Sequence, residues 1–226
     1  AISMEDAMMF SRLYKKGQKI IVKLNMEGKF VSDRWSRNIV AELPGSHYPE
    51  QVIVLGGHID SWDVGQGAHD DGGGCIAAWR AVKLIKDLNF TPKRTLRIVL
   101  WTNEENGGRG SKNYRDEHYS ELENHILAIE SDAGVFSPKG FGFIGSVDAR
   151  KIIFKIANLL DPIGAGKITK GGRAADIAIL NDEGVPVMSL NVDDSKYFWY
   201  HHTNADTFDK INFNDFNNCV AAIAIM

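Results

Sequence analysis

The sequence predicts an α/β fold in which a twisted, mostly parallel or mixed central sheet carries helices on both faces. Short, continuous apolar runs at residues 51–57, 95–102 and 185–191 are typical of strands that are buried on both faces. Segments with the spacing of amphipathic helices lie between these runs. Alternation of strands and helices favours a parallel sheet, because helices supply the long crossover connections that parallel strands need.

Composition limits the classes of partner that the chain can have. Its 226 residues are enough for a single domain with a closed core. A formal net charge of −3 argues against nucleic acid or an anionic membrane surface as a partner. No apolar run approaches the ~18 residues that a membrane span needs. We expect Cys75 and Cys219 to be buried free thiols, with a disulfide as the alternative.

The N-terminal part is predicted to form a helix followed by two strands. Ser3 can cap a helix over residues 3–17, which has acids in its first turn and lysines in its last. Residues 19–43 alternate well enough for two strands, with the turn at Glu27-Gly28. The chain starts without an initiator methionine or a signal peptide and stops within a predicted helix. We therefore expect it to be a fragment of a longer protein.

The remaining elements follow one another from the first buried strand to the end of the chain. Their boundaries come from changes in hydrophobic period and from glycine and proline between the segments. We predict strands at 51–57, 95–102, 126–132 and 185–191, and helices at 74–88, 148–160, 174–184 and 211–226.

Carboxylates and imidazoles follow four of the predicted strands. Any one of them alone would be an ordinary loop acid or surface histidine. Because the carboxyl ends of parallel strands meet at one edge of a sheet, the whole set predicts one working site. In chain order, the set is His58, Asp60 and Asp70, then Glu104 and Glu105, then Asp132, then His201 and His202.

The residue types in this set favour zinc or a similar divalent ion, because they combine carboxylates with imidazoles and lack thiolates. One catalytic zinc takes about three protein ligands, so the set exceeds the need of one ion and suffices for two. Glu104 and Glu105 can divide their work, one binding metal while the other takes a proton from water. A pair of acids that merely starts a helix is the alternative.

Four segments resemble the metal-site blocks of the M28 peptidase family, a group of aminopeptidases and carboxypeptidases with two co-catalytic zinc ions. The first block is particular to one branch of the family, and the likeness extends from about residue 36 to 210. The blocks are GGHIDSWDVGQGAHDDGGG (56–74), LWTNEENGG (100–108), ESDAG (130–134) and YHHTNADT (200–207).

The resemblance implies a ligand set for two zinc ions. His58 and Asp132 would bind one ion, while Glu105 and His202 would bind the other. Asp70 would bridge the two, so that each ion has three protein ligands. The peptide bond after this bridging aspartate is usually cis in the family.

The resemblance also implies roles around the metals. Glu104 would be the general base, and Asp60 would orient the imidazole of the preceding metal ligand from behind. Many relatives carry a tyrosine before the last histidine ligand, where it stabilises the oxyanion. His201 holds that position here and either donates in the same way or is a spacer. Asp206 would brace the last histidine or cap a turn, and Arg173 could meet a peptide carboxylate.

The implied activity is hydrolysis of small unblocked peptides, dipeptides among them, by a single catalytic domain spanning residues 1–226. The N-terminal region, an inserted protease-associated domain and the C-terminal end of such enzymes would lie outside this chain. An extracellular or lysosomal location and a homodimer are also implied. Two alternatives stay open: a receptor-like binding module of the same fold that has lost its metals, and a single-zinc acyltransferase resembling glutaminyl cyclase.

Overall fold

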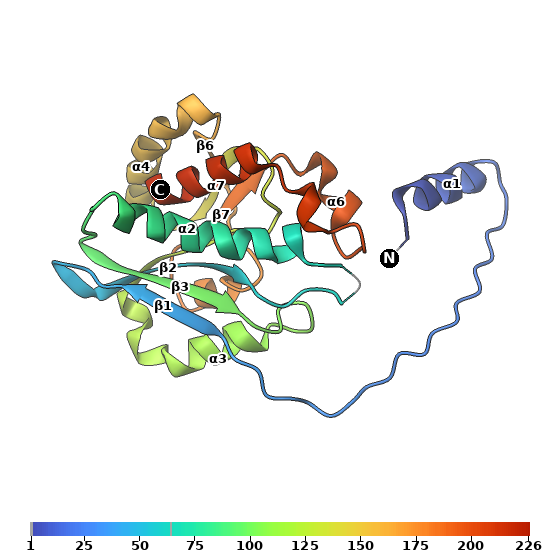
Figure 1. Cartoon of the computed structure of the whole chain (residues 1–226), viewed down its shortest axis with the longest axis horizontal. Coiled ribbons are helices and arrows are strands. Elements are labelled where there is room, and N and C mark those ends of the chain that lie inside the picture. Colours follow the sequence, from blue (N-terminus) through green and yellow to red (C-terminus); the bar gives the residue numbers. More distant parts are fainter. Residues whose placement is uncertain (1, 64) are drawn as a thin grey trace. The chain divides into compact units, whose positions relative to one another are not determined.

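The computed structural model describes residues 2–63 and 65–226, and its contacts divide the chain into two units, Ala1–Ser36 and Arg37–Met226. Figure 1 shows the elements of both units along the chain. Among the described residues, helices are too short or too polar to cross a lipid bilayer.

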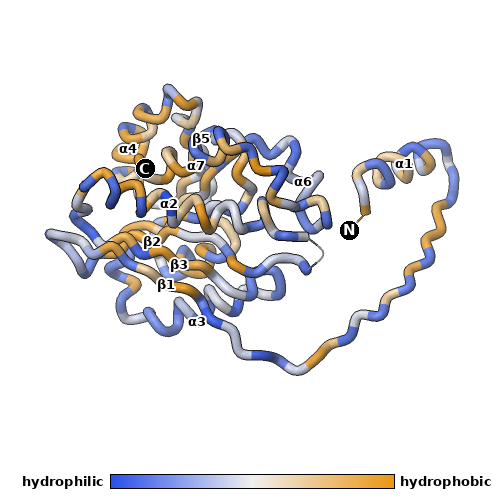
Figure 2. Tube along the Cα trace, viewed as in Figure 1, coloured by the Kyte–Doolittle hydropathy of each residue, from blue (hydrophilic) through white to orange (hydrophobic). Residues whose placement is uncertain are grey.

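The first unit contains the predicted helix but not the predicted strands. Helix α1 (Met4–Lys15) begins after Ser3, whose hydroxyl accepts the backbone N–H of Asp6 at 3.0 Å. The prediction of two strands over residues 19–43 was wrong, because the described backbone forms a strand only at Ile39–Leu43. Between α1 and β1, apolar side chains such as that of Trp35 are exposed. Figure 2 shows hydrophobic residues, in orange, along the backbone trace of this segment. An alternating pattern forms a strand only where a neighbouring strand completes its hydrogen bonds.

The second unit is built on a seven-stranded mixed sheet in the order β1-β3-β2-β4-β7-β5-β6. Its four middle strands β3, β2, β4 and β7 are parallel to one another. Strands β1 and β5 run antiparallel to their neighbours β3 and β7, and β6 is parallel to β5. The strands are β1 (Ile39–Leu43), β2 (Tyr48–His58), β3 (Arg94–Trp101), β4 (His125–Glu130), β5 (Pro138–Ile144), β6 (Lys167–Lys170) and β7 (Val187–Val192).

Helices cover both faces of this sheet, as the sequence predicts (Figure 1). One core cluster joins the strands to α2, α4 and α7, and a second joins them to α3 and α5. In residues 2–63 and 65–226, four short 3-10 helices complete the connections, at Tyr119–Asn124, Asn158–Ile163, Asp194–Lys196 and Phe208–Lys210. The helices are α2 (Gly73–Asp87), α3 (Arg109–Glu117), α4 (Val147–Ala157), α5 (Ala178–Asp182), α6 (Tyr197–Tyr200) and α7 (Phe213–Ile225).

The two cores follow from the side-chain pattern of the elements. In β2, Val52 and Val54 pack on one face of the sheet and Leu55 on the other, so the continuous apolar run serves both cores. Cys75 and Cys219 are buried free thiols, as expected, and each thiol donates to a backbone carbonyl at 3.1 Å.

Three elements have no clear signal in the sequence. Helix α3 buries little more than Tyr114 and two small residues, so its apolar stripe is too thin to recognise. Strand β5 contains Gly140 and Gly142, which weaken the intrinsic preference for a strand. Strand β6 is only four residues long and lies at the edge of the sheet beside β5.

Candidate metal centre

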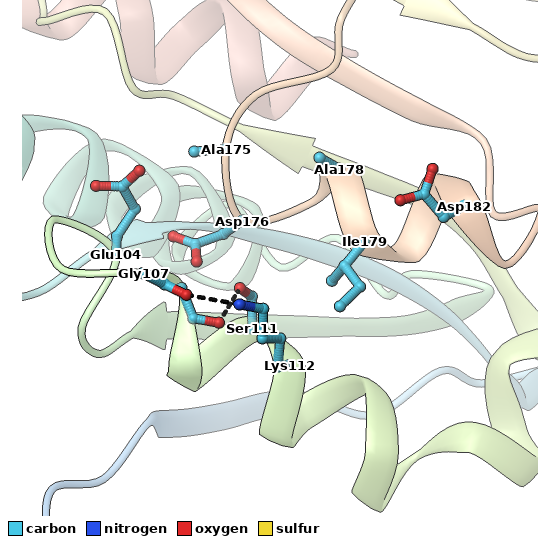
Figure 3. A pocket seen from close by; sticks show the side chains of 10 residues that line it. Glu104, Gly107, Ser111, Lys112, Ala175, Asp176, Ala178, Ile179 and Asp182 are labelled. Carbon is cyan, nitrogen blue, oxygen red and sulfur yellow. Dashed lines mark hydrogen bonds between the residues drawn. The ribbon is translucent and has the colours of Figure 1, made fainter.

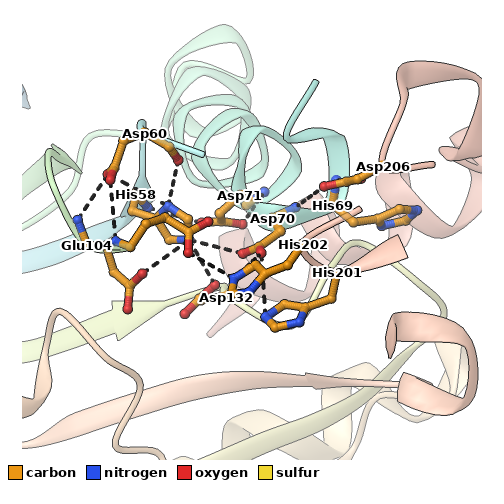
Figure 4. Close-up of polar contacts among 12 residues, drawn as sticks. His58, Asp60, His69, Asp70, Asp71, Glu104, Asp132, His201, His202 and Asp206 are labelled. Atoms are coloured by element: carbon orange, nitrogen blue, oxygen red, sulfur yellow. Dashed lines mark hydrogen bonds and ion pairs between the residues drawn. The ribbon is translucent and has the colours of Figure 1, made fainter. Parts of the chain in front are cut away.

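The eight predicted site residues gather at the carboxyl edge of the parallel strands. Because β2, β3, β4 and β7 are parallel, the segments that leave them lie at the same edge of the sheet. Figure 4 shows side chains from these four segments pointing toward one another. His58 ends β2, Glu104 and Glu105 follow β3, Asp132 follows β4, and His201 and His202 follow β7 and α6.

His58 and two carboxylates form one side of the centre. The His58 side chain is buried, with its Nε2 atom 3.2 Å from Asp70 Oδ1 and 3.3 Å from Asp132 Oδ1. Although burial lowers it, hydrogen bonds to Asp132 and Asp70 raise the pKa of His58 well above its ordinary value. The Nε2 atom of His58 therefore faces two carboxylates that favour a positive charge between them.

His202 and Glu105 form the other side. The His202 Nε2 atom lies 2.9 Å from Glu105 Oε2 and 3.3 Å from Asp70 Oδ2. Asp70 thus presents one oxygen to His58 and its other oxygen to His202. This is the placement that a carboxylate bridging two cations requires. The Asp70–Asp71 peptide bond is cis, as the resemblance implies.

The residues present fit a divalent metal such as zinc. The Oδ2 atom of Asp70 and the Oε1 atom of Glu105 are buried without a hydrogen-bond partner, a costly state unless a cation joins them. Within the described part of the chain, three overlapping groups have ligand atoms within 4.8 Å of one another. They are His58 with Asp70 and Glu105, His58 with Asp71 and Asp132, and Asp70 with His201 and His202.

Asp71 supports the centre through hydrogen bonds to the backbone, and it is not among the site residues that the sequence predicts. It is fully buried, and its two oxygens accept the backbone N–H groups of His58 and Gly74, both at 3.1 Å. A Cβ atom added at Gly57 would lie 2.0 Å from Asp71 Oδ2, so glycine is required there. The adjacent aspartate pair was the only signal in the sequence that could have found this residue.

Asp60 takes part in the centre differently from what the resemblance implies. The His58 Nδ1 atom is hydrogen-bonded to the backbone carbonyl of Asp60 at 2.8 Å, whereas the nearest carboxylate oxygen is 3.9 Å away. The Asp60 carboxylate instead accepts the backbone N–H groups of Glu104 and Glu105, at 3.0 and 3.3 Å. The main-chain carbonyl therefore orients the imidazole, while the side chain fixes the two glutamates (Figure 4).

Glu104 lies beside the ligand cluster without belonging to any of its three groups. Its Oε2 atom is 4.0 Å from His58 Nε2. Burial raises the pKa of Glu104 to about 7, with the neighbouring carboxylates acting in the same direction. A general base works best when its pKa is near the working pH, so this position suits proton transfer.

His201 also reaches the centre. Its ring stacks on that of His202 with 3.6 Å between centroids, and its Nε2 atom lies 3.6 Å from Asp70 Oδ2. Burial lowers the pKa of His201, which favours the neutral imidazole. The position is compatible with a hydrogen-bond donor to a reacting group.

Among the described residues no hydrogen bond or ion pair joins Asp206 to His202, so the expectation that Asp206 braces this histidine was wrong. Its buried carboxylate accepts the backbone N–H groups of His69 at 2.7 Å and Asp70 at 3.1 Å. The residue thereby ties the segment that follows β7 to the loop that carries the bridging aspartate. In the sequence Asp206 is near His202, whereas its contacts with the loop of Asp70 depend on the path of that loop, which the sequence does not reveal.

Replacing Asp206 by asparagine is expected to weaken zinc binding by about 10- to 100-fold. The change turns two charge-assisted hydrogen bonds into weaker ones and puts an amide donor near backbone donors. Competition with a chelating dye would measure the affinity. The exposed Asp209→Asn variant is the control, and equal affinity in the two variants would show that Asp206 does not position the loop.

Arg173 lies away from the ligand cluster. Its guanidinium is exposed and pairs with the carboxylate of Asp182 at 2.8 Å. Aromatic rings also lie at the centre: the Trp62 ring is 4.9 Å from that of His202, and the Tyr197 ring is 4.8 Å from that of His201.

The described architecture is similar to that of solved M28 peptidases. A peptidase M28 precursor from Shewanella amazonensis SB2B superposes with a TM-score of 0.80 at 39% identity, covering 83% of this chain and 43% of that one. BSAP, a zinc aminopeptidase from Bacillus subtilis, superposes at 0.66 with 17% identity, which shows the fold alone; 83% of this chain and 48% of that one are covered.

Sequence comparison leads to the same group. Carboxypeptidase Q from Bos taurus is 47% identical over 225 residues, covering 100% of this chain and 48% of the relative. The chain thus spans about half the length of the curated relatives it matches. This similarity confirms the carboxypeptidase Q branch of the family, which is the branch that the first motif block (residues 56–74) indicates. Because the model of peptidase family M28 also matches residues 38–226, nearly the whole second unit, the chain belongs to that family.

Proposed function

We propose that this protein is a zinc-dependent exopeptidase that hydrolyses small unblocked peptides, dipeptides among them. The observation that carries the proposal is Asp70, which presents separate buried oxygens to His58 and His202 within a full set of metal-capable side chains. Membership of the M28 family and similarity to carboxypeptidase Q support a peptidase.

Two zinc ions are the proposed cofactors. His58 and Asp132 would hold one ion, Glu105 and His202 the other, and Asp70 would be shared. When bound, zinc supplies a Lewis acid that polarises the carbonyl group of the scissile peptide bond.

The residues of the chain carry the proton transfers. Glu104 takes a proton from the attacking water and later delivers it to the nitrogen of the leaving amine. Asp60 holds the backbone of this glutamate in place through the 3.0 Å hydrogen bond. His201, in its neutral form, donates an N–H to the oxygen that gains charge as the carbonyl is attacked.

Location and assembly are proposed from the resemblance alone. We propose that the protein acts outside the cell or in lysosomes, with peptides rather than nucleic acid as its partners. A homodimer is the proposed assembly, and a sedimentation experiment on the purified protein would test it.

Removing zinc is expected to abolish hydrolysis of unblocked dipeptides, and adding it back is expected to restore the rate. The reason is that the carbonyl group then lacks its electrophilic partner and the buried carboxylates repel one another. Dipeptides with blocked termini should be cleaved more slowly, which marks an exopeptidase. Hydrolysis that persists in metal-free protein, verified by elemental analysis, would contradict the proposal.

The same assay separates the two alternatives. No bound zinc after reconstitution, together with no hydrolysis of any peptide, would favour a binding module that has lost its metals. One ion per chain together with cyclisation of N-terminal glutamine would favour a glutaminyl-cyclase-like acyltransferase. The two-sided placement of Asp70 is the observation against the single-zinc alternative.

A further inference from the structure

A cavity of about 410 Å³ opens beside Glu104, between the loop that follows β3 and the start of α5. A volume of this order accommodates an amino-acid side chain, and small-ligand sites begin at roughly 300 Å³. Figure 3 shows the residues around it. They are Glu104, Gly107, Gly108, Ser111, Lys112, Ala175, Asp176, Ala178, Ile179 and Asp182.

Asp176 is the unusual residue of this wall. Its side chain is fully buried, neither carboxylate oxygen lies within normal hydrogen-bond distance of a donor, and the Ser111 hydroxyl is the side-chain donor nearest to it in effect. Its own backbone N–H is directed to the carboxylate of Glu130. The Ser111 hydroxyl, which also lines the cavity, donates to the carbonyl of Gly108 at 3.1 Å. Burial raises the pKa of Asp176 to about 7, so a cationic hydrogen-bond donor placed beside this carboxylate would stabilise its charged form.

Apart from Glu104, which serves as the general base, the other charged side chains at the cavity are already paired. The Lys112 ammonium donates to the carbonyl of Gly107 at 2.8 Å, and Asp182 is held by Arg173. Ala175, Ala178 and Ile179 supply an apolar wall. A ligand that suits this combination has an aliphatic stem and a cationic hydrogen-bond donor at its end.

We propose that the cavity binds the cationic side chain, lysine or arginine, of the substrate residue next to the scissile bond, and that Asp176 determines this specificity. The inference rests on the proposed function, because Glu104 places the cavity directly beside the reacting peptide group. An α-ammonium group is too small to fill the volume and would leave the apolar wall uncovered.

The test compares substrates that differ only in the terminal charge. Lysyl-alanine is compared with norleucyl-alanine, and alanyl-lysine with alanyl-norleucine, on the zinc-loaded protein. In one of the two pairs, kcat/KM for the lysine peptide is expected to be about 10- to 100-fold higher than kcat/KM for the norleucine peptide. A charge-assisted hydrogen bond contributes a free energy of that size. Asp176→Asn should reduce that ratio to near one while norleucine peptides are still cleaved. Glu183→Gln, an acid of the same segment outside the cavity, should keep the ratio.

Binding provides a readout that does not depend on turnover. Calorimetry should show free lysine binding more tightly than norleucine to the unmodified protein, with the difference lost in Asp176→Asn. A variant without activity can still be judged in this way, and thermal unfolding shows that it is folded. A lysine preference that is absent, or that survives Asp176→Asn, would overturn the specificity assignment. Failure to cleave any of the four peptides would instead overturn the proposed function.

Discussion

Glu104→Gln is expected to lower kcat by about 10²- to 10⁴-fold while leaving zinc content unchanged. Glutamine has the same shape but cannot accept the proton of the attacking water or return it to the leaving amine. Glu104 is not in any of the three metal-capable groups, and its backbone is held by the Asp60 carboxylate. The substitution should therefore remove proton transfer without disturbing the ligands.

The measurement combines steady-state hydrolysis of a dipeptide with elemental analysis of the same sample. KM should change little, because the loss falls on a step after substrate binding. Glu117→Gln, an exposed acid at the end of α3, is the matched control and should behave as the unmodified protein. Turnover by Glu104→Gln within a few-fold of the control would remove this residue from the mechanism.

Asp70→Asn is expected to abolish tight binding of zinc at both positions. A carboxylate can offer an anionic oxygen to each of two ions, whereas a neutral amide offers one oxygen and one N–H group. The Asp70 oxygens lie 3.2 Å from His58 Nε2 and 3.3 Å from His202 Nε2, so the change affects both sides of the centre. Zinc content after dialysis and the zinc-dependent rise in Tm would measure the effect.

The rise in Tm follows from linkage, because zinc that binds only the folded state stabilises it by about 2.7 kcal/mol at a hundred times its Kd. The unmodified protein should show this rise and Asp70→Asn should not. Asp63→Asn changes an exposed acid of the same loop and should retain the rise. Retention of two ions by Asp70→Asn would mean that another residue joins the two halves.

The central part of the fold could be predicted from sequence because its signal is local. The apolar runs of β2, β3, β4 and β7 are continuous, which only strands covered on both faces can tolerate. The same reasoning failed over residues 19–38, where alternation suggested strands. There the described chain provides no neighbouring strand, and the side chain of Trp35 is fully exposed. Pattern alone cannot reveal whether a partner is present.

The sequence could predict which residues come together at the site. It could not predict which atoms of those residues make the contacts. Strand ends are known once the strands are known, so the convergence of His58 and His202 follows from topology. The contacts of Asp60, Asp71 and Asp206 depend on the paths of glycine-rich loops. Their carboxylates all accept backbone N–H groups, and no spacing in the sequence specifies such partners.

Crystallography of the zinc-loaded protein with anomalous scattering at the zinc edge tests the central claim most directly. Two peaks are expected per chain, one beside His58 and Asp132 and the other beside Glu105 and His202, with Asp70 between them. A single peak, or peaks away from these five side chains, would contradict the two-zinc centre.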